Sequence, residues 1–191
     1  MGPVFKLLTL TVAIAFICAQ EASAVQTKQL LPPRGFLPGT TFGSTFKLPK
    51  YRATINMFDA NNGIVLQLDF RINYGGLVKT LNVNSKPSGH AWKPEKKLTI
   101  NDNPAIREGL NIDVTVRGVN GNTFKIRVQE GTFGRDYTFT SQLPIASVTR
   151  IFWIADDSTE FGVMAWSYPV NENTRKMLTV HAKDLPNCKF C

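Results

Sequence analysis

The feature that most constrains the fold is a series of short runs in which apolar and polar residues alternate. Eight such runs follow one another, at residues 53–57, 64–71, 78–84, 111–117, 123–129, 136–140, 148–155 and 161–166. Turn-forming stretches such as "DANNG", "NYGG", "KPSG" and "GVNGN" separate them. The alternation is typical of half-buried strands, and no run shows sustained helical spacing. The pattern predicts an all-β fold of antiparallel strands, either a sandwich or a barrel.

One pair of runs carries a strong hairpin signal. Asn120-Gly121 stands between residues 111–117 and 123–129, and this dipeptide favours a tight turn between two alternating strands. In the second of these strands the apolar residues are expected in the core and their alternates on a basic outer face: Phe124, Ile126 and Val128 against Lys125, Arg127 and Gln129. Trp153 and Trp166 lie in apolar strand contexts and are also expected in the core.

The N-terminus has the three parts of a secretory signal. Lys6 precedes an apolar run at residues 7–19, and Ala22-Ser23-Ala24 forms an A-x-A cleavage site. A membrane anchor is the alternative, but the run is shorter than the roughly 20 residues that a span needs, and no later segment is long and apolar enough. We therefore expect a secreted, extracellular protein with these parts: a signal peptide at 1–24, an N-terminal extension at 25–35, one domain at 36–167 and a C-terminal extension at 168–191.

Two cysteines remain after the signal peptide. Cys188 and Cys191 form a C-x-x-C at the end of the sequence. A redox pair is one interpretation, but no helix follows that would activate the thiol. A metal site needs further ligands, and no second pair exists. A local or intermolecular disulfide is the favoured interpretation, and no metal or other cofactor is predicted.

Composition and charge narrow the possible partners. The chain is 43% hydrophobic and 19% charged, which is the composition of a globular protein. The net charge is +8, but the charges are scattered, which is typical of a mixed solvated surface. A basic stripe with aromatic platforms is absent, so nucleic acid is not predicted as a partner. Basic secreted proteins can bind anionic surfaces or glycans.

The strand at residues 64–71 carries a dense row of polar groups. Its even-numbered residues are apolar, so Gln67, Asp69 and Arg71 share the other face, about 7 Å apart. The next run places Asn84 on the same face, because the "NYGG" turn makes the two strands antiparallel neighbours. Trp92, Glu95 and Lys97 follow in "HAWKPEKK".

These residue types match the surface of a sugar. Arg71 supplies fixed donors, Glu95 can accept from it, and the amides of Gln67 and Asn84 both donate and accept. Trp92 supplies a flat apolar plate. A sugar offers hydroxyls to such polar groups and a patch of C–H groups to such a ring. Each group also has an ordinary interpretation: Trp92 as loop packing, Arg71 and Glu95 as a surface pair, Asn84 as solvated filler. Asp69 is interpreted as a charge partner of Arg71.

The arrangement resembles the galectins, the β-galactoside-binding lectins. Their motif is a strand with H-x-N-x-R, a following strand with Asn, and then W-G-x-E-x-R. The matching residues here are Gln67, Asp69, Arg71, Asn84, Trp92, Glu95 and Lys97. The flanking stretches "FLPGTTFGSTFKL" and "YRATINMFD" also look like the opening strands of the family. The resemblance covers about residues 36–167 and implies a two-sheet jelly-roll β-sandwich with a sugar on one concave face.

The chain departs from the motif at four positions. Gln67 replaces the His, Asp69 the first Asn, Lys93 the Gly and Lys97 the last Arg. A carboxylate only accepts hydrogen bonds, and a lysine lacks the planar donor set of arginine. Because an unpaired buried polar group costs roughly 1–3 kcal/mol, these departures bear directly on the preference for galactose.

The predicted function is therefore a lectin whose partners are glycans or glycoconjugates, with a possible homodimer. Two alternatives stay open: a protein-interaction module that has lost sugar binding, or a basic module that binds anionic glycans by charge through Lys86, Lys93, Lys96 and Lys97. Catalysis is not predicted, because no hydrolase or metalloprotease motif is present. Arg71 between Asp69 and Glu95 would leave neither carboxylate suited to act as an acid.

Overall fold

The structure is a computed structural model, and it describes residues 26–30, 35–73, 79–99, 101–155, 161–168 and 177–180. Several predictions concern features that lie outside this part of the chain. They are the signal peptide at 1–24, the turn that contains Tyr74, and both Cys188 and Cys191. The side chain of Trp166 also lies outside the described set.

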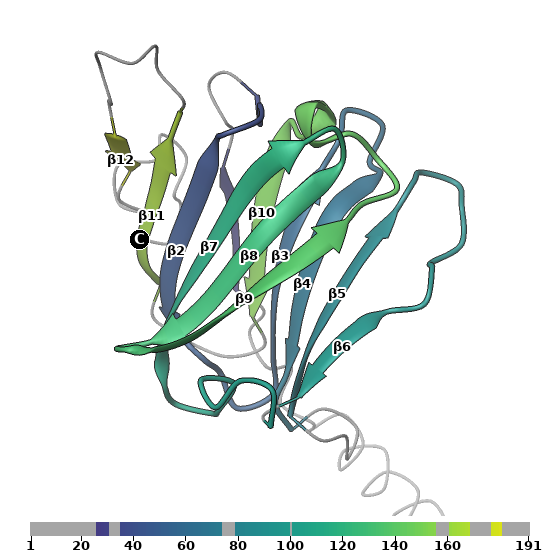
Figure 1. The fold of residues 1–191 in the computed structure, drawn as a ribbon. Helices are drawn as coiled ribbons and strands as arrows, with labels where there is room; N and C mark the ends of the chain where they lie inside the picture. The colour runs from purple at the N-terminus through teal and green to yellow at the C-terminus, as the bar shows by residue number, and fades with distance from the viewer. Residues whose placement is uncertain are drawn as a thin grey trace, which may run out of the picture.

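Two antiparallel sheets form the fold, which confirms the predicted all-β two-sheet sandwich (Figure 1). The first sheet has the order β1 (Gln26–Leu30), β10 (Arg150–Ala155), β3 (Arg52–Phe58), β4 (Ile64–Arg71), β5 (Thr80–Lys86) and β6 (Lys96–Thr99). The second has the order β12 (Met177–Val180), β11 (Phe161–Ser167), β2 (Thr41–Lys47), β7 (Asn111–Asn120), β8 (Thr123–Glu130) and β9 (Phe133–Thr140). A 3₁₀ turn, η1 (Ile145–Ser147), joins β9 to β10.

Strands from both ends of the chain add to the sheets. In β1, Gln26 lies opposite Ala155 of β10, and in β12, Met177 lies opposite Ser167 of β11. These two strands, together with β2 and β6, are not among the eight alternating runs. The strands β1, β6 and β12 are short, at four or five residues each, which is too short for alternation to stand out from the surrounding sequence. The strand β2 has seven residues and lies within the stretch that looked like an opening strand of the galectins.

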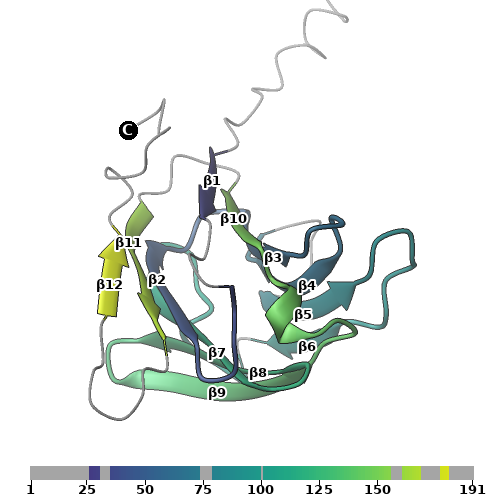
Figure 2. The ribbon, with the colours of Figure 1, turned by 90° about the horizontal axis from the view of Figure 1, so that it is seen from above.

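The two sheets face each other in the view from above (Figure 2), and the buried apolar side chains of the core come from both of them. Phe46 of β2 joins them: its ring is 5.7 Å from that of Phe70 on β4 and 5.9 Å from that of Trp153 on β10, both edge-on. The core predictions for Trp153 and for the apolar side of β8 are confirmed, because Trp153, Phe124, Ile126 and Val128 are all buried. Such edge-on pairs stabilise the packing beyond the area that they bury.

The predicted hairpin joins β7 to β8, but its turn lies one residue later than the Asn-Gly pair. Asn120 is the last residue of β7 and lies opposite Thr123, so Gly121 and Asn122 form the loop. Gly121 has a φ of +45°, a left-handed value that glycine adopts without steric cost. A register shift between Gly118 and Asn120 accounts for the displacement.

A lysine connects the end strands of the two sheets. Lys96 lies opposite Val83 of β5, a core residue, so its side chain is on the core side of β6. From there its ammonium donates to the carbonyl oxygen of Thr138 on β9, at 3.0 Å. Since β6 and β9 each end their sheet, this bond links the two sheets along one open side of the sandwich.

Candidate functional site

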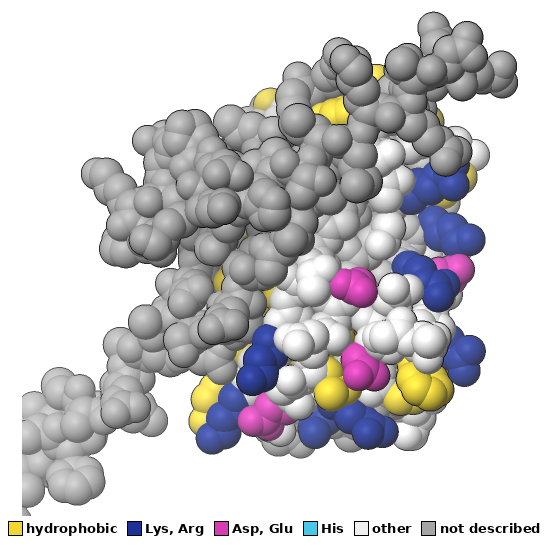
Figure 3. Space-filling model, turned by 90° about the vertical axis from the view of Figure 1, so that its left-hand side faces the viewer, with side chains coloured by type: hydrophobic (Ala, Val, Ile, Leu, Met, Phe, Trp, Pro, Cys, Tyr) yellow, Lys and Arg dark blue, Asp and Glu magenta, His cyan; other side chains and the backbone are white. Residues whose placement is uncertain are grey.

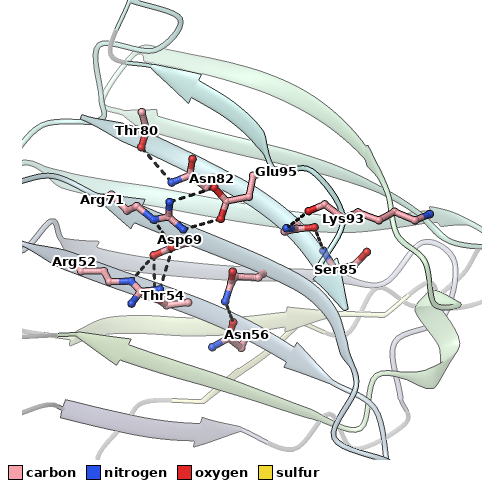
Figure 4. A network of polar contacts seen from close by, with 12 residues as sticks. Arg52, Thr54, Asn56, Asp69, Arg71, Thr80, Asn82, Ser85, Lys93 and Glu95 are labelled. Carbon is pink, nitrogen blue, oxygen red and sulfur yellow. Dashed lines mark hydrogen bonds and ion pairs between the residues drawn. The ribbon is translucent and has the colours of Figure 1, made fainter. Parts of the chain in front are cut away.

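Three rows of polar residues cross the outer side of the first sheet, and we call this surface the polar face. Directly opposite residues in an antiparallel pair share a face, so the strand registers define the rows. The rows are Asn56, Gln67 and Asn84; Thr54, Asp69, Asn82 and Lys97; and Arg52, Arg71, Thr80 and Thr99. Figure 4 shows most of these side chains meeting above β3, β4 and β5. The predicted grouping of Gln67, Asp69, Arg71 and Asn84 on one face is confirmed.

Asp69 is the centre of this network and is fully buried. Arg52 donates from Nε to Oδ1 at 2.7 Å and from Nη2 to Oδ2 at 3.1 Å. Arg71 donates from Nε to Oδ2 at 2.8 Å, and the hydroxyl of Thr54 lies 3.3 Å from Oδ1. The prediction that Asp69 pairs with Arg71 is confirmed, but a second arginine shares the carboxylate. A buried carboxylate requires such partners, because its removal from water is otherwise very costly.

Arg71 is held on two sides. Its Nη2 donates to Oε1 of Glu95 at 2.6 Å and its Nη1 to Oε2 at 3.2 Å, a two-bond geometry that fixes the guanidinium plane. Burial opposes the charge of the guanidinium, but hydrogen bonds and charges from Glu95 and Asp69 outweigh it, so the pKa of Arg71 lies above its ordinary value. The side chain is 18% exposed, so this fixed cation remains in reach of a ligand.

The amide residues of the face are buried, which corrects one interpretation from the sequence. Asn84 is not solvated filler: it is 2% exposed, its Nδ2 donates to the carbonyl oxygen of Lys93 at 2.9 Å, and its Oδ1 accepts from the backbone N–H of Ser85 at 2.8 Å. Gln67 is also nearly buried and donates from Nε2 to Oδ1 of Asn56 at 3.0 Å. The bond to Lys93 fixes the loop before β6 against the sheet.

Trp92 is the aromatic group of this loop. Its side chain is 44% exposed, and it directly precedes Lys93, whose carbonyl is bound by Asn84. The Nζ of Lys86 lies 5.5 Å from the centre of the indole ring, a cation–π distance. Trp92 is therefore an exposed aromatic ring in the loop that Asn84 fixes against the sheet.

Three of the four lysines of the charge-based alternative lie in different surroundings. Lys96 is on the core side of β6 and bonds to Thr138, and Lys86 lies over Trp92. Lys97 lies opposite Asn82 on the polar face and is exposed. Within the described residues, Lys97 makes no hydrogen bond or ion pair. Lys86, Lys96 and Lys97 therefore contact different parts of the molecule.

The polar face contains residues that the predicted site does not include. Arg52 was overlooked, although Arg52, Thr54 and Asn56 alternate with core residues of β3 as Gln67, Asp69 and Arg71 do in β4. Reading that strand with a period of two would have found it. Asn82 was not named among the candidate site residues. It is 1% exposed, donates to Oγ1 of Thr80 at 3.2 Å, and has an Oδ1 for which the described structure offers no hydrogen-bond partner.

Other kinds of site find no support in the part of the chain that the structure covers. Over those residues, no three histidine, cysteine, aspartate or glutamate side chains come together in a group that could hold a metal ion. Nor does any helix there have the length and apolar character needed to cross a bilayer.

The fold was compared with known proteins. No protein-family model and no curated protein sequence matches the chain. Among solved structures, a tetrameric galectin from the ball sponge Cinachyrella is similar, with a TM-score of 0.56, 21% identity and coverage of 73% of this chain and 97% of that one. The fold is that of the galectins. Within this fold, a homodimeric agglutinin from chicken liver has a TM-score of 0.59 and 15% identity, over 74% of this chain and all of that one.

A third galectin was solved with a sugar bound. It is the toad ovary galectin in complex with thio-digalactose, which has a TM-score of 0.57 and 15% identity over 73% of this chain and 97% of its own. Because the sequence identities are low, these similarities establish the galectin fold of the chain and nothing beyond the fold. The expected jelly-roll sandwich of the galectin type is thereby confirmed.

Proposed function

We propose that this protein is a secreted lectin that binds β-galactoside-type or related glycans on its polar face, without catalysis. The observation that carries the proposal is the fixed guanidinium of Arg71, held by Asp69 and Glu95 on the same sheet that supports the exposed Trp92. Galectin structures include one with a bound thio-digalactose. Secretion is supported by the signal-like sequence at residues 1–24.

The chemistry of the face suits hydroxyl groups. Arg71 has five N–H groups, three of which bond to Asp69 and Glu95, so each terminal nitrogen keeps one N–H for a ligand. Since both carboxylates hold the guanidinium in place, little conformational entropy is lost when it binds a sugar oxygen. The exposed ring of Trp92 can pack against the C–H face of the same sugar.

The carboxylates of the face are unsuited to acid–base catalysis. Both oxygens of Asp69 accept from arginines and the residue is fully buried. Both oxygens of Glu95 accept from Arg71. Glycoside hydrolysis needs one protonated and one free carboxyl on opposite sides of the sugar. The face therefore supports binding rather than hydrolysis, and glycoconjugates are the proposed partners.

A glycan array with three proteins tests the proposal. Wild type is compared with Arg71→Ala and with Arg127→Ala, a control arginine on the outer side of β8 that also pairs with a carboxylate, that of Asp136. We expect wild type and Arg127→Ala to bind the same glycans, and Arg71→Ala to lose at least tenfold in affinity. All three proteins should keep the same circular dichroism spectrum.

Two outcomes would contradict the proposal. If wild type binds no glycan, the protein-interaction alternative replaces it. If glycans bind equally well to wild type and to Arg71→Ala, the sugar lies elsewhere on the molecule.

Light scattering of the wild type in the same buffer measures whether the protein is a homodimer, which is the proposed assembly.

A further inference from the structure

The polar face uses up most of its own hydrogen-bond acceptors. Asp69 and Glu95 give all four carboxylate oxygens to arginines. The side-chain oxygens of Asn84 and Asn56 accept from Ser85 and Gln67.

Two side-chain amide oxygens of the face lie outside these bonds. The Oδ1 of Asn82 has no partner in the described structure but is buried, so it is not presented to a ligand. The Oε1 of Gln67 accepts no hydrogen bond that the described structure shows, and Gln67 is 9% exposed. Most side-chain acceptors of the face are therefore already engaged by a donor of the protein, and each oxygen of Glu95 keeps a second lone pair.

Donors, in contrast, remain available on the same face. Arg71 keeps one N–H on each terminal nitrogen, as described above. Lys97 is exposed and makes no bond within the described residues, and an ammonium has three N–H donors and no acceptor. A complementary ligand must supply acceptors to these groups.

The charges of the face favour the same kind of ligand. Its rows and the Glu95 loop hold three cationic side chains, Arg52, Arg71 and Lys97, against two carboxylates, Asp69 and Glu95. Each carboxylate is already paired with an arginine. Lys97 is the cation outside these pairs, and it lies in the same row as Asp69 and Asn82.

Basic residues are also in excess elsewhere on the molecule. The outer side of the second sheet carries four cations, Lys47, Arg117, Lys125 and Arg127, against Asp113 and Asp136. On the face shown in Figure 3, basic and acidic side chains are interspersed among uncharged ones. On the outer side of β8, Lys125 and Arg127 both pair with Asp136. A ligand that is attracted merely by the net charge of +8 would therefore have no reason to choose the polar face.

We propose that the polar face selects acidic saccharides, in which Lys97 binds a sulfate or carboxylate substituent of the sugar held by Arg71. This inference rests on the proposed lectin function and names the class of glycan. A sulfate or carboxylate offers several acceptor oxygens and a negative charge, which are the properties that the free donors and the excess cation require. Lys97 is thus a specificity-determining residue, and Arg71 binds the sugar itself.

The test uses a matched set of saccharides and two lysine variants. The set contains one neutral β-galactoside disaccharide, its sulfate esters at single positions, and its sialylated form, each titrated by calorimetry at low and physiological salt. Lys97→Gln removes the proposed contact. Lys47→Gln is the control, since Lys47 is an exposed lysine at the end of β2 on the other sheet and its loss changes the net charge equally.

We expect wild type and Lys47→Gln to bind at least one acidic form tenfold or more tightly than the neutral parent, and Lys97→Gln to lose that preference while still binding the parent. Comparison of the sulfated and sialylated forms shows which acidic group is recognised. Equal binding of acidic and neutral forms by wild type would overturn the inference but leave the lectin function intact. If both lysine variants lose the preference for acidic forms equally, the preference comes from general charge attraction, and the inference about Lys97 is overturned. Absence of binding to every member would overturn both proposals.

Discussion

Arg52 binds Asp69 diagonally across β3 and β4, with Nε 2.7 Å from Oδ1 and Nη2 3.1 Å from Oδ2. Its directly opposite neighbour in the register is Arg71, so the two guanidinium groups approach the same carboxylate from adjacent strands. Asp69 keeps two like charges together in one small region and connects β3, β4 and the Glu95 loop through a single network (Figure 4). This arrangement leads to the first two predictions.

The replacement Asp69→Asn should destabilise the fold markedly. It leaves two arginines beside a neutral group, and loss of one partner from a buried ion pair costs about 3–5 kcal/mol. Because Arg52 and Arg71 are 33% and 18% exposed, we expect the lower end, about 3 kcal/mol. Urea denaturation measures the change. Asp136→Asn is the control, since this exposed carboxylate also meets two cations and its loss should cost less than about 1 kcal/mol. Equal losses would contradict the central role of Asp69.

Arg52 and Arg71 should be energetically coupled. Both bind Asp69, so the free energies of unfolding lost in Arg52→Ala and Arg71→Ala should fail to add in the double variant by about 1 kcal/mol. A double-mutant cycle measures this coupling. The pair Arg71→Ala and Arg127→Ala, which lie on different sheets, should be additive. Additivity in the first cycle would show that each arginine stabilises the fold independently of the other.

Asn82 and Asn103 should differ in how much stability is lost when each is replaced by leucine. Asn82 is buried with an unpartnered Oδ1, so Asn82→Leu should change the free energy of unfolding by less than about 1 kcal/mol. Asn103 is equally buried but bonds to the carbonyl of Val128 and to the N–H of Ala105. Its replacement by Leu strands both backbone groups and should cost about 2 kcal/mol or more. Thermal unfolding of both variants checks the order, and a larger loss in Asn82→Leu would reverse it.

Phe46 should be among the most sensitive core positions. Its ring packs edge-on against Phe70 and Trp153 of the opposite sheet, and removal of a buried phenylalanine side chain costs about 3–5 kcal/mol. Phe133 of β9 is 67% exposed, so Phe133→Ala should change stability by about 0.5 kcal/mol or less. Guanidinium denaturation of both alanine variants gives the comparison. A small loss in Phe46→Ala would mean that the sheets are held together elsewhere.

Much of the fold was predictable from alternation alone. The run at residues 64–71 coincides with β4, and its apolar side, Leu66, Leu68 and Phe70, is fully buried. Period-two patterning is strong there because one side of the sheet packs on the core. The short edge strands β1, β6 and β12 lacked this signal. The hairpin turn moved by one residue because of an irregularity in β7 that sequence patterns do not reveal.

The site was predicted in its members but not in its internal bonding. The sequence showed which polar residues share a face, and β4 and β5 bring them together as expected. It did not show that Asn84 turns inward to the carbonyl of Lys93, because that bond depends on the path of a loop. The role of Arg52 depends on the register between β3 and β4, which a single sequence does not specify. Side-chain pairing across strands therefore required the structure.

The bond from Lys96 to Thr138 affects how copies of this protein could join. A strand added to an open sheet edge needs the backbone carbonyls of that edge for its own N–H groups. At β9, the carbonyl of Thr138 is already bound by the Lys96 ammonium, so a neighbouring chain would have to displace a charged donor to extend the sheet there. Lys96 therefore disfavours the addition of a strand from another molecule at the β9 edge.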